Sequence, residues 1–257
     1  MWTPDVYEGS PAPITGFLAT ISKGAVFAAT LRLYVIGEFH SFPTLVTGLT
    51  ILSIISILVG NLLALKQENI KRLLAYSSIA HFGYLLIALI ASGTLAPNGI
   101  SAVEPSAYYL VGYIFTTLIA TGLIAAISSS NNEENAKLCD IAGLFWKSPL
   151  LALCLSVSLL SLAGIPLTAG FIGKLYIFQM GAESGAWLLL SILIIGSGIG
   201  IYYYLRLIFS MTTNSSSSNL SLTPAFSVTV SLITLTILVL YLGIYPQPLM
   251  EYLLWNT

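Results

Sequence analysis

Two lysines lie inside long apolar segments of this chain, where the sequence offers a charged side chain no polar neighbours. Lys174 follows a glycine–proline interruption in GIPLTAGFIGKLYIFQM, and Lys23 lies in PITGFLATISKGAVFAATLRLYVIG. An ionisable side chain at membrane depth carries a penalty of about 3 kcal/mol or more, and such residues commonly belong to an ion or proton pathway. The pattern therefore favours Lys23 and Lys174 as groups that take up and release protons.

Each lysine also has a structural interpretation. If its segment is helical, Lys23 lies roughly 15 Å from either membrane surface, too far for its side chain of about 6 Å to reach. It could instead bind backbone carbonyls and tie two helices together. Lys174 could satisfy the carbonyl groups that a helix break around Pro166 leaves without partners.

A histidine in another apolar segment could connect the two lysines. His81 lies near the middle of KRLLAYSSIAHFGYLLIALI, on the same segment as Ser77, Ser78 and Tyr84. Histidine changes its charge close to neutral pH, which suits a proton relay. A single histidine on an apolar helix is as often a hydrogen-bonded packing residue, and the neighbouring hydroxyl groups fit either role.

No carboxylate falls at the centre of an apolar segment. The ten acidic residues are Asp5, Glu8, Glu38, Glu68, Glu104, Glu133, Glu134, Asp140, Glu183 and Glu251. A buried lysine needs a counter-charge, water or a changed protonation state. We therefore expect an acidic partner in another chain or in a segment outside these 257 residues.

The composition is that of a polytopic membrane protein. Of the 257 residues, 56% are hydrophobic and 7% are charged, and the mean hydropathy is +0.91, so polar side chains are too few for a soluble surface. A net charge of −1 without a basic tail argues against nucleic acid as a partner. Cys139 and Cys154 are neither clustered nor close to histidines, which argues against a metal site or a disulfide.

The apolar segments predict an all-α fold with about seven transmembrane helices, since a helix needs about 20 residues to cross the bilayer. The candidate spans are 13–37, 44–65, 70–92, 106–128, 148–181, 186–210 and 223–245. The fifth is too long for one straight crossing and contains Gly164, Pro166, Gly170 and Gly173. We expect a discontinuous helix there, a feature typical of transport sites.

The basic loop residues gather on one side of the predicted membrane. The side that receives the N-terminus and the loops 66–69, 129–147 and 211–222 holds most of them: Lys66, Lys71, Arg72, Lys137 and Lys147, with Arg206 nearby. The other side has only Arg32. The positive-inside rule places the N-terminus in the cytoplasm and the C-terminus on the opposite side of the membrane.

Motifs of soluble catalytic sites are absent from the sequence. It has no glycine-rich phosphate loop, no nucleophile elbow and no cysteine cluster for an iron–sulfur centre. Electron-transfer cofactors are therefore expected elsewhere. The aromatic run Tyr202, Tyr203 and Tyr204 lies near the end of a predicted span and is interpreted as an interfacial belt.

Five strings along the chain carry a family resemblance. In order, they are WTPDVYEGSPAP, FLATISKGAVF, GNLLALKQENIKRLLAYSSIAHFGYLL, LSLAGIPLTAGFIGKLY and IYYYLR. In this order and spacing they closely resemble the subunit N family of the bacterial proton-pumping NADH:quinone oxidoreductase, respiratory complex I. This family belongs to the antiporter-like membrane subunits.

The resemblance implies an antiporter-like fold with two inverted helical repeats. On this basis 13–37 is the last helix of the first repeat, 44–210 is the second repeat, and 223–245 is the final helix. Members of the family carry further helices before this point. The resemblance therefore implies that residues 1–257 form one transmembrane domain, the C-terminal half of such a subunit.

The resemblance also implies roles for the three titratable residues. Lys23 matches the central lysine of a hydrated row at mid-membrane, and Lys174 matches the lysine of the broken helix in the second repeat. His81 matches a histidine that bridges them. The lysine of the preceding helix, its glutamate partner and the histidine beside it are absent from this sequence.

The function that the resemblance implies is proton transport across the bacterial inner membrane, coupled to electron transfer from NADH to quinone in other subunits. The chain would be a translocase subunit with no redox centre of its own. FMN, iron–sulfur clusters and quinone are expected in partner subunits, and the expected partners are other membrane-arm subunits, the lipid bilayer and protons.

Two other functions fit the same residues. One is a subunit of a multisubunit cation/proton antiporter, because the shared fold does not fix the function. The other is a non-transporting membrane scaffold whose lysines only hold helices together. Neighbouring genes would separate the first from an oxidoreductase, and lysine-to-methionine variants with intact transport would indicate the second.

Overall fold

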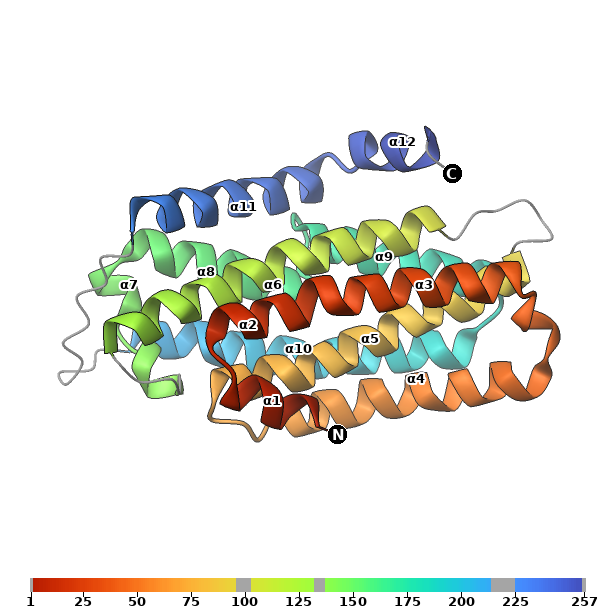
Figure 1. The fold of residues 1–257 in the computed structure, drawn as a ribbon, viewed down its shortest axis with the longest axis horizontal. Helices are drawn as coiled ribbons and strands as arrows, with labels where there is room; N and C mark the ends of the chain where they lie inside the picture. Colours follow the sequence, from red (N-terminus) through yellow and green to blue (C-terminus); the bar gives the residue numbers. More distant parts are fainter. Residues whose placement is uncertain (1, 96–102, 132–136, 214–224, 256–257) are drawn as a thin grey trace.

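The computed structural model describes residues 2–95, 103–131, 137–213 and 225–255, and these ranges are almost wholly helical (Figure 1). The elements are α1 (Thr3–Gly9), α2 (Ala12–Phe17), a π-helical turn (Leu18–Ser22), α3 (Lys23–Ile36), a 3₁₀ turn (Phe39–Ser41), α4 (Pro43–Ala64), α5 (Ile70–Leu95), α6 (Val103–Asn131), a 3₁₀ turn (Leu138–Ile141), α7 (Leu144–Lys147), α8 (Pro149–Ala163), α9 (Ala169–Glu183), α10 (Trp187–Thr212), α11 (Phe226–Ile244) and α12 (Gln247–Trp255). No strand occurs in the described ranges, and the predicted all-α fold is confirmed.

Six helical segments of the described ranges are long and apolar enough to cross a membrane. They are Ala12–Ile36, Pro43–Ala64, Ile70–Gly93, Val103–Ser128, Trp187–Thr212 and Phe226–Ile244. The fifth predicted span, 148–181, consists of α8 and α9, which have 15 residues each and are separated by residues 164–168. A helix of that length is about 22 Å long and too short for the bilayer, so the two halves share one crossing. The predicted discontinuous helix is confirmed.

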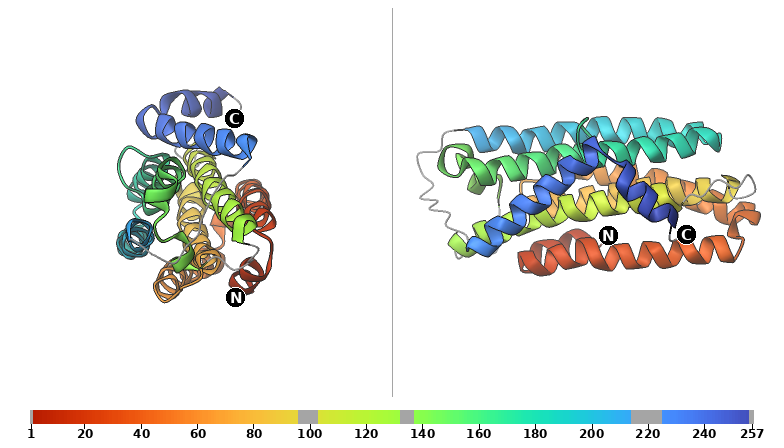
Figure 2. Two further views of the ribbon diagram at one scale, coloured as in Figure 1. Left: turned by 90° about the vertical axis from the view of Figure 1, so that its left-hand side faces the viewer. Right: turned by 90° about the horizontal axis from the view of Figure 1, so that it is seen from above.

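α5 is the central helix of the bundle. In its most apolar stretch 83% of the residues are buried, compared with 22% in α4 and 28% in α11 at the periphery. The helices α1, α3, α4, α6 and α9 all pack against α5, and the view along the bundle shows it enclosed (Figure 2). The outer helices expose large apolar side chains, such as Ile51 on α4 and Ile194 on α10, as a lipid-facing surface does.

The sequence GIPLT ends α8 and turns the chain into α9. Gly164 closes α8 in a left-handed conformation (φ 83°) that residues with a Cβ avoid, and Pro166 has no N–H to continue the helix. Leu167 also has a positive φ (76°), which for a bulky residue stores about 1–3 kcal/mol of strain. Gly243 of α11 packs against the backbone of Leu167 and Thr168, and this contact holds the break.

Three local elements lie outside what the apolar pattern predicts. The π-helical turn Leu18–Ser22 interrupts the first span directly before Lys23, and one such turn changes the direction in which the following residues face. The short helices α1 and α12 flank the first and last spans (Figure 1). Both are too short to give a hydrophobic periodicity that the sequence alone would reveal.

The helix α1 is fastened to the start of α5. Arg72 forms ion pairs with Glu8 (2.8 Å) and Asp5 (3.2 Å). The Lys71 ammonium donates to the carbonyl of Ser10 (3.0 Å). This fastening lies at the end of the bundle that also holds the loop 65–69 and α7, which we call the α7 end.

Candidate functional site

Lys23 begins α3, directly after the π-helical turn, and its side chain points toward α5. Its ammonium donates a hydrogen bond to the Ser78 hydroxyl. It also lies 5.4 Å from the centre of the Tyr7 ring, whose face attracts a cation. Burial raises the pKa of the Tyr7 hydroxyl above its ordinary value, so the ring beside the ammonium stays uncharged.

Ser78 connects Lys23 to helix α6. Its hydroxyl shares a hydrogen bond of 2.5 Å with the hydroxyl of Tyr113 on α6. The Tyr113 ring in turn lies 5.2 Å, centre to centre, from the imidazole of His81. A hydroxyl both donates and accepts a hydrogen bond, so this pair can carry a proton away from the Lys23 ammonium.

His81 is buried at the centre of the bundle, with 5% of its surface exposed. Its Nδ1 hydrogen-bonds the hydroxyl of Tyr109 on α6 (2.6 Å), and its Nε2 lies 3.3 Å from the hydroxyl of Tyr204 on α10. Both ring nitrogens therefore have a hydroxyl partner. An imidazole held in this way can accept a proton on one nitrogen and release one from the other.

Lys174 lies on α9 and reaches back to the end of α8. Its ammonium donates to the carbonyls of Leu162 (3.1 Å) and Ala163 (2.8 Å) and lies 5.2 Å from the centre of the Tyr84 ring. The last carbonyls of a helix are without intrahelical partners and favour a cation. The break in the helix is therefore what creates the binding site for this charge, as the structural interpretation of Lys174 expects.

A small polar cavity of about 10 Å³ separates His81 from Lys174. This volume is at the lower limit for one water molecule. The polar residues that line it, besides these two, are Tyr109, Tyr113, Thr116 and Ser161. The fold therefore brings the three predicted residues together. Hydrogen bonds link Lys23 to Ser78 and Tyr113, whose ring packs against His81, and Lys174 lies across a space the size of one water.

The comparisons with known proteins place the chain in a family. Residues 1–200 match the family described as NADH:quinone oxidoreductase/Mrp antiporter, TM. The chain belongs to this family. The matched range contains Lys23, His81 and Lys174, and it ends just before the tyrosine run of α10.

The relatives of the chain confirm the predicted resemblance to the subunit N family. A curated NADH-quinone oxidoreductase subunit N from Methylococcus capsulatus is 51% identical over 198 residues, which cover 77% of this chain and 40% of the relative. Respiratory complex I from Thermus thermophilus with bound aureothin contains a chain with 36% identity and a TM-score of 0.83, over 97% of this chain and 53% of that one.

A more distant neighbour shows how widely the fold is shared. The Mrp complex from Dietzia sp. contains a chain with a TM-score of 0.83 and 17% identity, over 98% of this chain and 54% of that one. At this identity the likeness is one of fold alone. The chain spans about 40% of the length of the curated relative it matches.

In the part of the chain that the structure describes, neither Lys23 nor Lys174 forms an ion pair. The ion pairs of Arg72 lie at the α7 end, and the ammonium groups of Lys23 and Lys174 are instead surrounded by hydroxyls, carbonyls and ring faces. No group of three or more His, Cys, Asp or Glu side chains that could hold a metal ion occurs in the same ranges. Cys139 is exposed and Cys154 is buried, and both are free thiols.

The interpretation of the tyrosine run as an interfacial belt is wrong for two of its three members. Tyr202 is 66% exposed, but Tyr203 and Tyr204 are each 1% exposed and lie in the core. The reason is that α10 continues to Thr212, so the run lies about two turns inside the helix. Tyr109 and Tyr113 of α6 were also missed as site residues. Their spacing of four, which puts both hydroxyls on one helix face, is the signal that could have found them.

Proposed function

We propose that this chain is a membrane-arm subunit of an NADH:quinone oxidoreductase that carries protons across the membrane. Electron transfer from NADH to quinone takes place in other subunits. The observation that carries the proposal is a half-buried lysine, a buried histidine and a buried second lysine, with hydroxyl groups between them at the centre of a membrane-spanning bundle. The identity to curated NADH-quinone oxidoreductase subunits N supports the oxidoreductase over an antiporter.

The proposed proton path begins at Lys23. The ammonium gives a proton to the Ser78 hydroxyl, which passes its own proton to Tyr113. Tyr113 and His81 both line the small cavity, and His81 exchanges protons with it through its Nδ1 and the Tyr109 hydroxyl. A water molecule there would complete the path to Lys174, since Thr116 and the other polar walls of the cavity can hold it.

The carbonyls around Lys174 give the path an end point. They favour the charged ammonium, but they do not neutralise it as a carboxylate would. The group can therefore hold a proton and release it when the charge distribution nearby changes. We infer that electron transfer in the partner subunits supplies this change through a charged group outside the described residues.

We further propose the setting of this path. The chain lies in a bacterial inner membrane beside other membrane-arm subunits, and FMN, iron–sulfur clusters and quinone belong to the partner subunits. The α7 end faces the cytoplasm, because the loops with Lys66, Lys137 and Lys147 meet there; the backbone of Asn69 pairs with that of Lys137. Residues 44–210 form one helical repeat of the antiporter-like fold.

The test measures proton translocation and NADH oxidation together in the intact complex. Lys23→Ala is expected to lower the number of protons moved per NADH severalfold. The loss is incomplete because Lys23 also lines an open cavity of about 310 Å³, from which water can partly replace it. Lys66→Ala, which removes an exposed lysine at the α7 end, is the matched control and should pump normally. Unchanged pumping in Lys23→Ala and Lys174→Ala would refute the proposed function.

A further inference from the structure

The second nitrogen of His81 has a partner that the proposed path does not use. Its Nδ1 and the Tyr109 hydroxyl already face the cavity that leads to Lys174. Nε2 faces the hydroxyl of Tyr204 instead, and that hydroxyl shares a further hydrogen bond with the hydroxyl of Ser77. Two buried hydroxyls on α5 and α10 therefore extend from His81 in a different direction.

That direction leads toward the α7 end of the bundle. α5 begins at this end and α10 finishes there, where the Trp146 indole of α7 donates to the carbonyl of Thr212 (3.1 Å). Ser77 lies about one turn before His81 on α5, and Tyr204 lies about two turns before the end of α10. The side branch thus runs from the centre of the bundle toward the surface that carries the basic loops.

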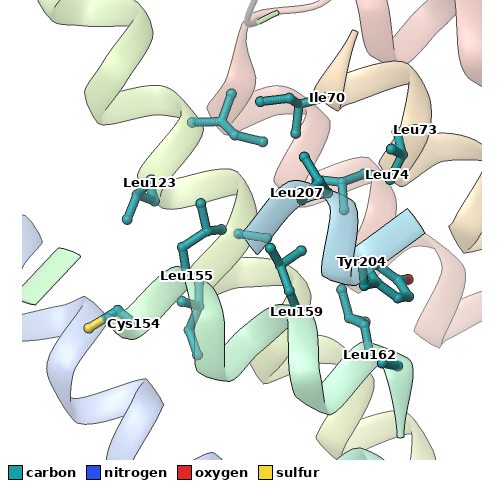
Figure 3. Close-up of a cluster of buried hydrophobic side chains, with 14 of the residues drawn as sticks. Ile70, Leu73, Leu74, Leu123, Cys154, Leu155, Leu159, Leu162, Tyr204 and Leu207 are labelled. Carbon is teal, nitrogen blue, oxygen red and sulfur yellow. The ribbon is translucent and has the colours of Figure 1, made fainter. Parts of the chain in front are cut away.

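Apolar side chains close the branch before it reaches that surface. The next turns of α5 and α10 place a compact group of them beyond Ser77 and Tyr204, each at most 5% exposed: Ile70, Leu73, Leu74, Leu207 and Met211. Figure 3 shows Leu73, Leu74 and Leu207 beside Tyr204 in this cluster. We call these five residues the apolar plug. It contains no side chain that could pass a proton on.

We propose that Tyr204 and Ser77 form a second proton branch at His81, which leads to the α7 end and is shut by the apolar plug. This inference rests on the proposed function. His81 is then a branch point at which a proton arriving from the α7 end joins the path between the two lysines. Opening the branch requires water to enter between the plug residues.

One proton can pass along the branch without leaving a charge behind. Ser77 takes a proton from a hydronium ion in the water beyond the plug and gives its own to the oxygen of Tyr204, and Tyr204 gives its own to Nε2 of a neutral His81. The imidazole then releases its Nδ1 proton to the oxygen of Tyr109, and Tyr109 gives its own proton to water in the small cavity. Each O–H or N–H bond that breaks is replaced by one that forms, so Tyr204 needs no phenolate intermediate.

The neighbouring tyrosine offers a matched control for a merely structural role. Tyr203 is as deeply buried as Tyr204, and its ring lies 4.4 Å from that of Tyr204, centre to centre. Its hydroxyl, however, donates to the side-chain oxygen of Asn61 (3.0 Å) rather than to His81. Tyr203→Phe and Tyr204→Phe each remove one buried, hydrogen-bonded hydroxyl and keep the ring.

The test compares these variants in the intact complex. Tyr204→Phe is expected to lower the protons moved per NADH by at least half of the loss in Lys174→Ala, and Tyr203→Phe to leave the ratio near wild type. Because Ser77 and Tyr204 act in series, Ser77→Ala with Tyr204→Phe should lose about as much as either change alone. Normal pumping in Tyr204→Phe, or equal losses in both tyrosine variants, would overturn the branch. If Lys174→Ala also pumps normally, the proposed function fails instead.

The plug has its own test, a measurement of passive proton leak in proteoliposomes. Leu207→Ser puts a hydroxyl into the plug and admits water, so the leak should rise severalfold. Leu189→Ser makes the same change at a buried site near the opposite end of α10 and should leave the leak unchanged. Equal leaks in the two variants would show that the plug does not close a proton path.

Discussion

Replacing Lys174 by alanine is expected to remove most proton translocation from the intact complex while the variant still inserts into the membrane. The side chain lies in an enclosed site, 8% exposed, where the carbonyls of Leu162 and Ala163 hold the ammonium at the small cavity. Among the described residues that line that cavity, only His81 and two tyrosines are titratable besides Lys174. A proton in the cavity therefore has no other lysine or acid to reach if Lys174 is removed. At Lys23, by contrast, the open cavity lets water partly replace the lost side chain. Protons moved per NADH oxidised is the measurement.

The arginine variant separates transport from structure at this position. Lys174→Ala leaves two buried carbonyls without a donor, which by itself destabilises by about 1–3 kcal/mol each. Lys174→Arg keeps a positive charge and several donors, but a guanidinium does not release its proton in a protein. If Lys174 carries protons, both variants fail to pump and only Ala loses stability. Restored pumping in Lys174→Arg would show that the residue acts only as a fixed cation.

The three titratable residues were predictable because they break the apolar pattern. Lys23, His81 and Lys174 are polar groups in segments where nearly every neighbour is apolar, and such groups cluster at working sites in membranes. The break before Lys174 was equally readable, because Gly164 and Pro166 cannot both lie inside a continuous helix. The residue types along the chain, apolar in the spans and polar or helix-breaking at a few positions, were thus enough to predict the spans and the three candidate site residues.

The hydrogen-bond partners of these three residues were harder to predict. The sequence around a residue does not show toward which neighbouring helix its side chain points. Apolar residues lie on all faces of α5, α6 and α10, so no amphipathic stripe reveals which side faces the centre. The contacts of Tyr113 with Ser78 and of Tyr204 with His81 depend on how whole helices pack. The π-helical turn before Lys23 has the same origin, since it aims the side chain at α5 and has no sequence signal of its own.

The expected acidic partner of the lysines stays a prediction. Within the described residues the two ammonium groups are balanced by neutral dipoles and ring faces, which stabilise a cation less than a carboxylate does. This arrangement leaves each lysine responsive to a charge that approaches from outside. A carboxylate in another chain or in a segment outside these 257 residues is what the proposed coupling requires.

A methyl group added at Gly170 is expected to destabilise the fold by about 3 kcal/mol or more, because it overpacks a site that cannot relax. Gly170 lies in the first turn of α9, and a Cβ built on it falls inside the contact distance of the Ser161 carbonyl oxygen on α8. That oxygen belongs to helical backbone, which cannot move aside as a flexible side chain can. Gly170→Ala should lower the unfolding temperature of the purified protein and its abundance in the membrane.

Gly198→Ala is the matched control, since it adds the same methyl group to a helical glycine of α10 with no atom of another group within 4 Å. There alanine improves helix propensity, so stability should stay level or rise by up to about 1 kcal/mol. The opposite stability changes expected for the two variants test whether α8 and α9 approach closely. They also test the position of Lys174, which lies four residues after Gly170 on the same face of α9. If Gly170→Ala were as stable as Gly198→Ala, the two half-helices would lie too far apart for the Lys174 ammonium to reach the carbonyls of Leu162 and Ala163.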